Sequence, residues 1–165
     1  MRLTHFAATV ALAIMAGIGL TGCAATVNLE PADGSDDPAC AEVSVRLPGA
    51  IGDQPRRWTD AQATGAWGDP ATILLTCGVT APGPTTMRCE TVAGVDWIID
   101  ETDAPRFRVT TYGRTPAVEI YLDTEVGDDG AGVSSRDVLD AISPIVATLP
   151  VDGQCVGRED ATPVP

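Results

Sequence analysis

The residue types that could carry chemistry in this chain are carboxylates, tyrosines and cysteines, because histidine and lysine are almost absent. The chain has one histidine, His5, and all 10 of its basic residues are arginines. His5 lies in a segment that we expect to be removed. The remaining chain then offers no Ser-His-Asp or Cys-His nucleophile, no histidine-ligated zinc and no Schiff-base lysine. Acid–base work would rest on carboxylates, Tyr112, Tyr121 or a cysteine. We therefore expect a protein that is not an enzyme and that uses no cofactor.

The most closely spaced carboxylates lie in an acidic segment over residues 123–130. They are Asp123, Glu125, Asp128 and Asp129. Such a group is a candidate for weak calcium binding, or for the paired carboxylates of glycoside hydrolysis. A run of like charges is more typical of a solvated loop. We therefore expect no metal site and no hydrolase centre here, and leave calcium binding by this segment as an open alternative.

A second candidate site combines an aromatic ring with charged groups. Trp67 and Asp69 belong to the turn signal WGDP and could form a sugar-binding platform of ring face and carboxylate. Arg57 and Arg114 are candidates to hold an anionic group. The alternative is structural, since tryptophan is usually largely buried and loop arginines are usually solvated or paired with carboxylates. We favour the structural interpretation and keep these four as the candidate binding residues.

Cys23 has a different chemistry, which its place after an apolar run indicates. Residues 1–22 have a short positive start and an uncharged run over 7–20, a pattern typical of a signal peptide and too short for a permanent membrane span. The run ends in LTGC (residues 20–23), which resembles the bacterial lipobox, where the cysteine is acylated and becomes the N-terminus. We therefore expect a lipoprotein with fatty-acyl chains such as palmitate on Cys23, held at the extracytoplasmic face of the cell membrane.

The other cysteines predict disulfides. They are Cys40, Cys77, Cys89 and Cys155. In an exported protein, four cysteines indicate two disulfides. One set pairs Cys40 with Cys77 and Cys89 with Cys155, and a competing set pairs Cys77 with Cys89 and Cys40 with Cys155. No two of them have C-x-x-C spacing, which argues against metal or redox chemistry. Spacing alone leaves both sets open.

The rest of the chain divides into a tether, a domain and a tail. Residues 23–37 are acidic and contain proline, glycine and serine, a composition that predicts a flexible tether. Residues 38–156 are expected to form a single domain, and residues 157–165 a disordered tail. The formal net charge of −13 disfavours nucleic acid as a partner. Besides membrane lipid held through Cys23, we expect the partner to be an envelope protein or a cell-wall component.

The hydrophobic pattern of the domain predicts helices at its two ends. A short helix begins at Asp37-Pro38. A longer helix is capped by Ser134, kinked or split by Pro144 and ended by Pro150. Residues 52–65 are polar and predict a loop. Strands are predicted in chain order over 72–79, 87–92, 95–99, 107–111 and 118–122.

These elements predict an α+β fold. The strands form an antiparallel sheet of four to five strands, in order from Thr72 to Leu122, with 72–79 central because its apolarity is nearly continuous. Both helices are expected to pack on one face of the sheet and to leave the other face for solvent or a partner. Across the last hairpin, Arg106 or Arg108 is expected to pair with Glu119.

Several motifs occur in an order that resembles a known family. They are the lipobox, a cysteine-led helix ending in Leu47-Pro48, Arg56-Arg57, AWGDP (66–70), CGV (77–79), GVDW (94–97) and TTYGR (110–114). The order resembles the actinobacterial lipoproteins that carry the domain of unknown function 3515, over residues 40 to 149. The resemblance implies a membrane-anchored envelope protein with no assigned activity. It also implies the pair Cys40–Cys77, which leaves Cys89 with Cys155.

Overall fold

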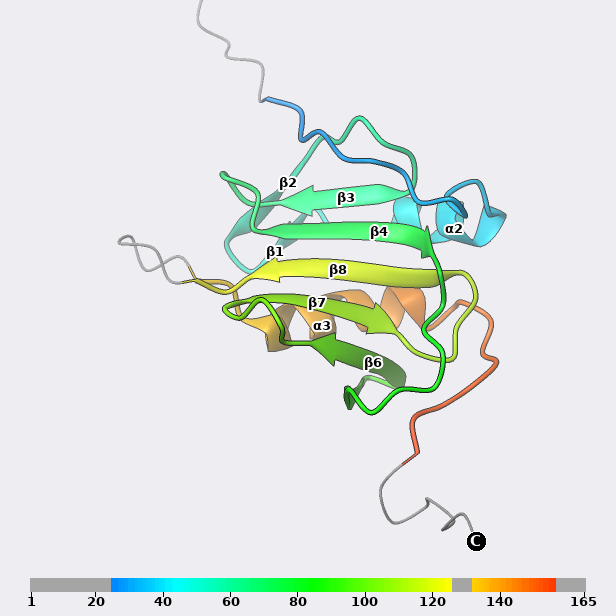
Figure 1. The fold of residues 1–165 in the computed structure, drawn as a ribbon. Coiled ribbons are helices and arrows are strands. Elements are labelled where there is room, and N and C mark those ends of the chain that lie inside the picture. Colours follow the sequence, from blue (N-terminus) through cyan, green and yellow to red (C-terminus); the bar gives the residue numbers. More distant parts are fainter. Residues whose placement is uncertain (1–24, 126–131, 157–165) are drawn as a thin grey trace, which may run out of the picture.

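The computed structural model describes residues 25–125 and 132–156, and in these residues an eight-stranded antiparallel sheet carries two helices on one face (Figure 1). The helices are α2 (Pro38–Arg46) and α3 (Ser135–Val146). The strands are β1 (Ala50–Ile51), β2 (Gln54–Arg57), β3 (Thr64–Trp67), β4 (Ile73–Val79), β5 (Arg88–Val92), β6 (Val95–Asp100), β7 (Arg106–Thr111) and β8 (Ala117–Asp123). Their spatial order is β1-β2-β3-β4-β8-β7-β6-β5. The α+β class is therefore confirmed.

The core lies between the sheet and the two helices. On β4, Ile73, Leu75 and Cys77 are fully buried, and they alternate with half-buried residues as a strand with one covered face requires. The apolar side chains of α2 and α3 belong to the same buried cluster. Trp97 Nε1 donates a hydrogen bond of 3.0 Å to Ser143 Oγ on α3, which joins β6 to that helix. The prediction that both helices cover one face is confirmed (Figure 1).

Both helices begin where the capping residues predict. The Asp37 side chain accepts a hydrogen bond of 2.8 Å from Ala39 N, and Pro38 is in the first turn of α2. At α3, Ser134 Oγ accepts from Asp137 N at 3.3 Å. Pro144 lies inside α3, which continues to Val146 as one helix. The prediction that this proline splits the helix is therefore wrong.

The predicted number of strands is too small. Residues 52–65, predicted as a loop, contain β2 and the start of β3, and β1 lies just before them. The hydrophobic pattern did not predict β2, because its sequence, QPRR, is polar and contains Pro55. Proline is tolerated near a sheet edge, where a missing donor costs little. β3 is short and includes Gly65, so it carried no alternating signal.

The strands also do not follow one another in space as they do along the chain. β4 pairs with β8, and β5 forms the far edge of the sheet. The chain therefore crosses from β4 to the far edge and returns through three antiparallel pairings, β5–β6, β6–β7 and β7–β8. β4 is central, as its apolarity predicted, because both of its neighbours are paired through most of its length.

Residues 25–37, predicted to belong to a flexible tether, are instead bound to the domain. Leu29 N donates to Asp60 Oδ1 at 2.9 Å, and Gly34 N donates to Gly78 O at 3.1 Å. Val27 forms a parallel bridge with Thr59. In Figure 1 this segment runs along the β3 side of the sheet. Composition missed the segment because backbone groups, not apolar side chains, supply most of these contacts.

Candidate functional site

Trp67, the aromatic candidate for ligand binding, lies in the core. Its side chain is fully buried, and its Nε1 donates a hydrogen bond of 3.0 Å to Pro48 O. It occupies the last position of β3, on the face that the helices cover. A buried ring whose polar atom is satisfied contributes packing to the fold. The structure therefore supports the structural interpretation of this tryptophan.

Arg57 and Asp69 do meet, as an ion pair. Arg57 Nη1 lies 2.7 Å from Asp69 Oδ1 and donates to Gly68 O at 3.0 Å. Arg57 Nη2 donates to Ala25 O at 2.7 Å. The guanidinium therefore joins β2 to the turn after β3 and to the segment that begins at residue 25. Nη1 and Nη2 both donate to oxygen atoms of the protein, whereas Nε is buried and has no hydrogen-bond partner among the described residues.

Arg114 lies in the loop between β7 and β8, and its side chain is buried beside the end of α3. It is 6% exposed, and its guanidinium donates to Ala147 O at 3.1 Å, Leu149 O at 2.8 Å and Gly94 O at 3.1 Å. The bonds to Ala147 O and Leu149 O satisfy carbonyl groups that the end of α3 leaves without partners, and the bond to Gly94 O joins them to the β5–β6 turn. The four candidate residues therefore do not converge on one site. Only Arg57 and Asp69 are in contact with each other.

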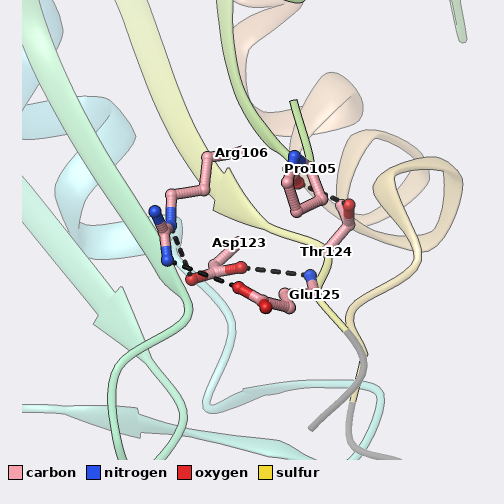
Figure 2. Close-up of polar contacts among 5 residues, drawn as sticks. All are labelled: Pro105, Arg106, Asp123, Thr124 and Glu125. Carbon is pink, nitrogen blue, oxygen red and sulfur yellow. Dashed lines mark hydrogen bonds and ion pairs between the residues drawn. The ribbon is translucent and has the colours of Figure 1, made fainter. Parts of the chain in front are cut away.

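The acidic segment is held by Arg106 at the end of the β7–β8 hairpin. Figure 2 shows the guanidinium of Arg106 facing the carboxylates of Asp123 and Glu125. Arg106 Nε lies 3.2 Å from Asp123 Oδ2, and Nη2 lies 3.4 Å from Glu125 Oε2. Thr124 Oγ1 donates to Pro105 O at 2.6 Å (Figure 2). The hydrogen bond to Asp123 is the main cause that raises the pKa of Arg106.

These ion pairs bear on the role of the carboxylates that were candidates for catalysis or calcium binding. Asp123 and Glu125 share one arginine cation, which offsets one of their two negative charges. Asp128 and Asp129 lie outside the described residues. In the described part of the segment, the arrangement is that of a hairpin end fixed by ion pairs.

The face of the sheet away from the helices holds a depression. Its floor comes from neighbouring positions of three strands, because Leu74 pairs with Tyr121, Thr76 pairs with Glu119, and Arg108 pairs with Tyr121. Leu29 and Glu30, from the segment over residues 25–37, form one wall of it. The depression has a volume of about 520 Å³ and is lined by Leu29, Glu30, Leu74, Thr76, Arg108, Glu119 and Tyr121. We call these seven residues the open face. In the sequence, Arg108, Glu119 and Tyr121 were marked as the half of each strand's alternation that faces away from the core.

The open face combines apolar surface with an exposed ion pair, Arg108 with Glu119, whose members could pair with groups of a bound molecule instead. Arg108 Nη1 lies 3.2 Å from Glu119 Oε1, and its guanidinium carbon lies 5.5 Å from the centre of the Tyr121 ring. The ion pair that the hairpin predicted is therefore confirmed for Arg108. Exposed pairs of this kind add little to stability. Leu29 and Leu74 add aliphatic surface. The volume is in the range of ligand sites, and such a mixture suits recognition more than catalysis.

Asp100 adds a fixed negative charge beside this face. It pairs with Arg108 across the β6–β7 ladder. Its Oδ1 accepts hydrogen bonds from the backbone N of Thr102 at 2.9 Å and from the Thr102 hydroxyl. The hydroxyl bond is the largest cause that lowers the pKa of Asp100. This carboxylate therefore stays ionised to lower pH than a free aspartate.

The described cysteines form the pairs that the resemblance implied. Cys40 is bonded to Cys77 and Cys89 to Cys155, with Cα atoms 5.6 and 6.4 Å apart. The first pair ties α2 to β4, and the second ties the edge strand β5 to the segment after α3. Asp96 lies close to the second pair and accepts a hydrogen bond of 2.7 Å from Cys155 N. Because both sulfur atoms are in a disulfide, this group has a structural role.

Comparison with known proteins places the chain in a family. A family model described as "Protein of unknown function (DUF3515)" matches residues 4–150. No curated protein and no solved structure matches the chain. Within the described ranges, neither helix has the length and apolarity needed to cross a bilayer. Since the match covers most of the chain, the protein belongs to the DUF3515 family of proteins of unknown function.

Proposed function

We propose that this protein is an actinobacterial cell-envelope lipoprotein and a non-enzymatic binding or scaffolding module. Acylated Cys23 would anchor it to the extracytoplasmic face of the cell membrane. The LTGC motif after an uncharged apolar run supports the anchor, and two disulfides suit an oxidising compartment. The mature chain would lack histidine and lysine, which supports a role in binding.

The open face is the observation that carries the binding role. The helices cover one side of the sheet, and the other side keeps a depression of about 520 Å³ at its centre. Tyr121, Leu29 and Leu74 give it apolar area, while Arg108 and Glu119 sit in an exposed ion pair. Interfaces of soluble domains combine aromatic and arginine side chains in this manner. A partner segment lying in the depression would bury the ring and re-pair the charges.

Site-specific crosslinking in cells tests this proposal. A photoreactive residue at Thr76, on the open face, is expected to give one discrete crosslinked species in the membrane fraction. The matched control is a photoreactive residue at Arg136, which is exposed on α3 on the other side of the sheet. Equal crosslinking from both positions, or none from Thr76, would contradict a partner on the open face.

Fractionation tests the anchor separately. Cys23→Ala is expected to remove the acyl chains and to release the protein from the membrane fraction. Cys23 is the only cysteine outside the two disulfides, so Cys23→Ala leaves both of them in place. A Cys23→Ala chain that still carries fatty acid, as read by mass spectrometry, would exclude this site of lipidation.

A second candidate is binding of a small ligand or a cell-wall fragment. The candidate set Arg57, Trp67, Asp69 and Arg114 gives this little support, because Trp67 and Arg114 are buried and Asp69 is already paired with Arg57. The open face supports it, since the Arg108 guanidinium lies over the Tyr121 ring and is paired with Glu119. Soluble cell-wall fragments are then expected to raise the melting temperature of the protein, and Tyr121→Ala to abolish that shift. A shift that survives Tyr121→Ala would place the ligand elsewhere.

A further inference from the structure

Trp58 is the exposed tryptophan of this chain, and it lies beside the start of the described residues. It is 80% exposed, whereas Trp67 and Trp97 are fully buried. Val27 N donates a hydrogen bond of 2.8 Å to Trp58 O. The parallel bridge between Val27 and Thr59 fixes the same two segments together. In Figure 1 the chain enters the domain next to the segment that follows β2.

The distance along the chain from Cys23 to this point is short. Arg57 Nη2 donates to Ala25 O at 2.7 Å, so residue 25 is held against the domain. Two residue steps separate Cys23 from Ala25, and they span at most about 7 Å when fully extended. A free segment from Cys23 to Asp37 would have allowed about 50 Å. The polar headgroup layer of one leaflet is itself about 5–8 Å thick.

We propose that Trp58 lies in the headgroup layer of the phospholipid bilayer that holds Cys23, so that the β2 side of the sheet docks directly on the membrane. This rests on the proposed anchor, because the anchor brings residue 23 to the bilayer. The short connection then leaves the neighbouring surface no room to stand away from the lipid. Tryptophan suits that layer, since its ring is apolar and its N–H finds polar partners there.

The ring, and not charge, is the attractive group on this side. Arg57 is paired with Asp69, and Arg56 donates to Leu47 O at 3.1 Å at the end of α2. The net charge of −13 gives no general attraction to anionic lipid. Docking is therefore expected on zwitterionic phosphatidylcholine and is expected to be insensitive to salt.

The strand order provides an internal control. From β2 to β5 there are six strand spacings of about 4.8 Å, or roughly 29 Å across the sheet. Met87 is exposed and immediately precedes β5. A tryptophan placed at residue 87 therefore reports on the side of the sheet that faces away from the proposed membrane contact.

Quenching by brominated lipid tests the docking. The acylated chain is isolated from membranes and reconstituted in phosphatidylcholine vesicles that contain bromine-labelled acyl chains. The Trp58 part of the emission, obtained by difference from Trp58→Phe, is expected to fall by at least half. The chain with Trp58→Phe and Met87→Trp is expected to show no such loss. Co-sedimentation and the mass of the Cys23 peptide are read on the same samples.

The outcomes separate docking from anchoring. An acylated, vesicle-bound chain whose Trp58 is quenched by aqueous iodide and not by brominated lipid would overturn the docking and leave the anchor intact. Equal quenching from residues 58 and 87 would also overturn it, because the sheet would then have no fixed orientation. A parent chain with Cys23 intact that carries no acyl group and stays in the soluble fraction would overturn both proposals.

Discussion

Burial separates the roles of two tryptophans that stand nine residues apart in the sequence. Trp67 is fully buried, and Trp58 is 80% exposed. Trp67→Ala is expected to lower the free energy of unfolding by about 3–5 kcal/mol, because it leaves a cavity and removes the donor to Pro48 O. Trp58→Ala is expected to change it by less than about 0.5 kcal/mol. Urea unfolding measures both, and similar values for the two variants would contradict the assignment.

The buried guanidinium of Arg114 is expected to contribute to the free energy of unfolding to an extent comparable with the ring of Trp67. Arg114→Met keeps much of the side-chain volume and removes the donors to three carbonyl groups. Leaving buried acceptors without partners is expected to lower the free energy of unfolding by about 3 kcal/mol. Arg136→Met is the matched control, because Arg136 is 71% exposed in an i,i+4 pair with Asp140. Chemical denaturation that showed equal losses would refute a structural role for Arg114.

The Asp100 carboxylate provides a pH prediction with a defined sign. Its pKa is lowered in the folded chain, mainly by the Thr102 hydroxyl. Such a group adds stability above the pKa it has when unfolded, and the contribution is lost as pH falls through its folded-state pKa. Thr102→Val is expected to raise the pKa of Asp100 toward its ordinary value of 3.8. An NMR titration of the carboxyl carbon checks this, and an unchanged midpoint would exclude the hydroxyl as the cause.

Sequence alone gave a mixed account of these residues. Tryptophan is usually largely buried, and Trp67 of the predicted turn follows that rule. Arginine in a turn predicts solvent contact, so the burial of Arg114 had no signal. Its partners are carbonyls distant in sequence, and only the packing of α3 on the sheet brings them near. The disulfide pairing followed from the family resemblance, since spacing alone did not decide among the three connectivities that four cysteines allow.

At the scale of elements, the sequence predicted the strands that an apolar pattern marks and the helices that a capping residue marks. The strands from β4 to β8 alternate or are continuously apolar, and both helices have capping residues. β2 is polar and contains proline, so nothing apolar marked it. Residues 25–37 depend on backbone hydrogen bonds, which side-chain composition does not report. The pairing of β4 with β8 is a long-range contact, and such contacts leave no local pattern.

One glycine pair should control the attachment of residues 25–37. Gly78 has a φ of +92°, and a Cβ there would overlap the Gly34 carbonyl group. Gly78→Ala is therefore expected to displace the segment and to lower the free energy of unfolding by about 1–3 kcal/mol. Gly83→Ala is the control, because its Cβ would meet open space. Faster amide hydrogen exchange over 27–37 should appear only for Gly78→Ala; equal exchange in both variants would contradict the attachment.

At the scale of the whole molecule, the sheet separates three tasks. One face packs on the helices, the open face presents the depression, and the β2 side lies next to the proposed anchor. Direct docking on the bilayer would hold the plane of the sheet in a defined orientation. The open face would then be presented beside the membrane and not at the end of a long tether. The covered face and the open face were predicted from the hydrophobic pattern, but the place of the β2 side was not, because composition predicted free movement for residues 23–37.

The central claim is that the open face recognises a partner, and an exchange of charges tests it most directly. The double variant Arg108→Glu with Glu119→Arg keeps the ion pair and reverses its direction beside Tyr121. The free energy of unfolding should stay within about 0.5 kcal/mol of the parent. The crosslinked species from position 76 should fall at least tenfold, while the exchange Arg136→Asp with Asp140→Arg on α3 leaves it unchanged. An undiminished crosslink in the Arg108 and Glu119 exchange would contradict the account.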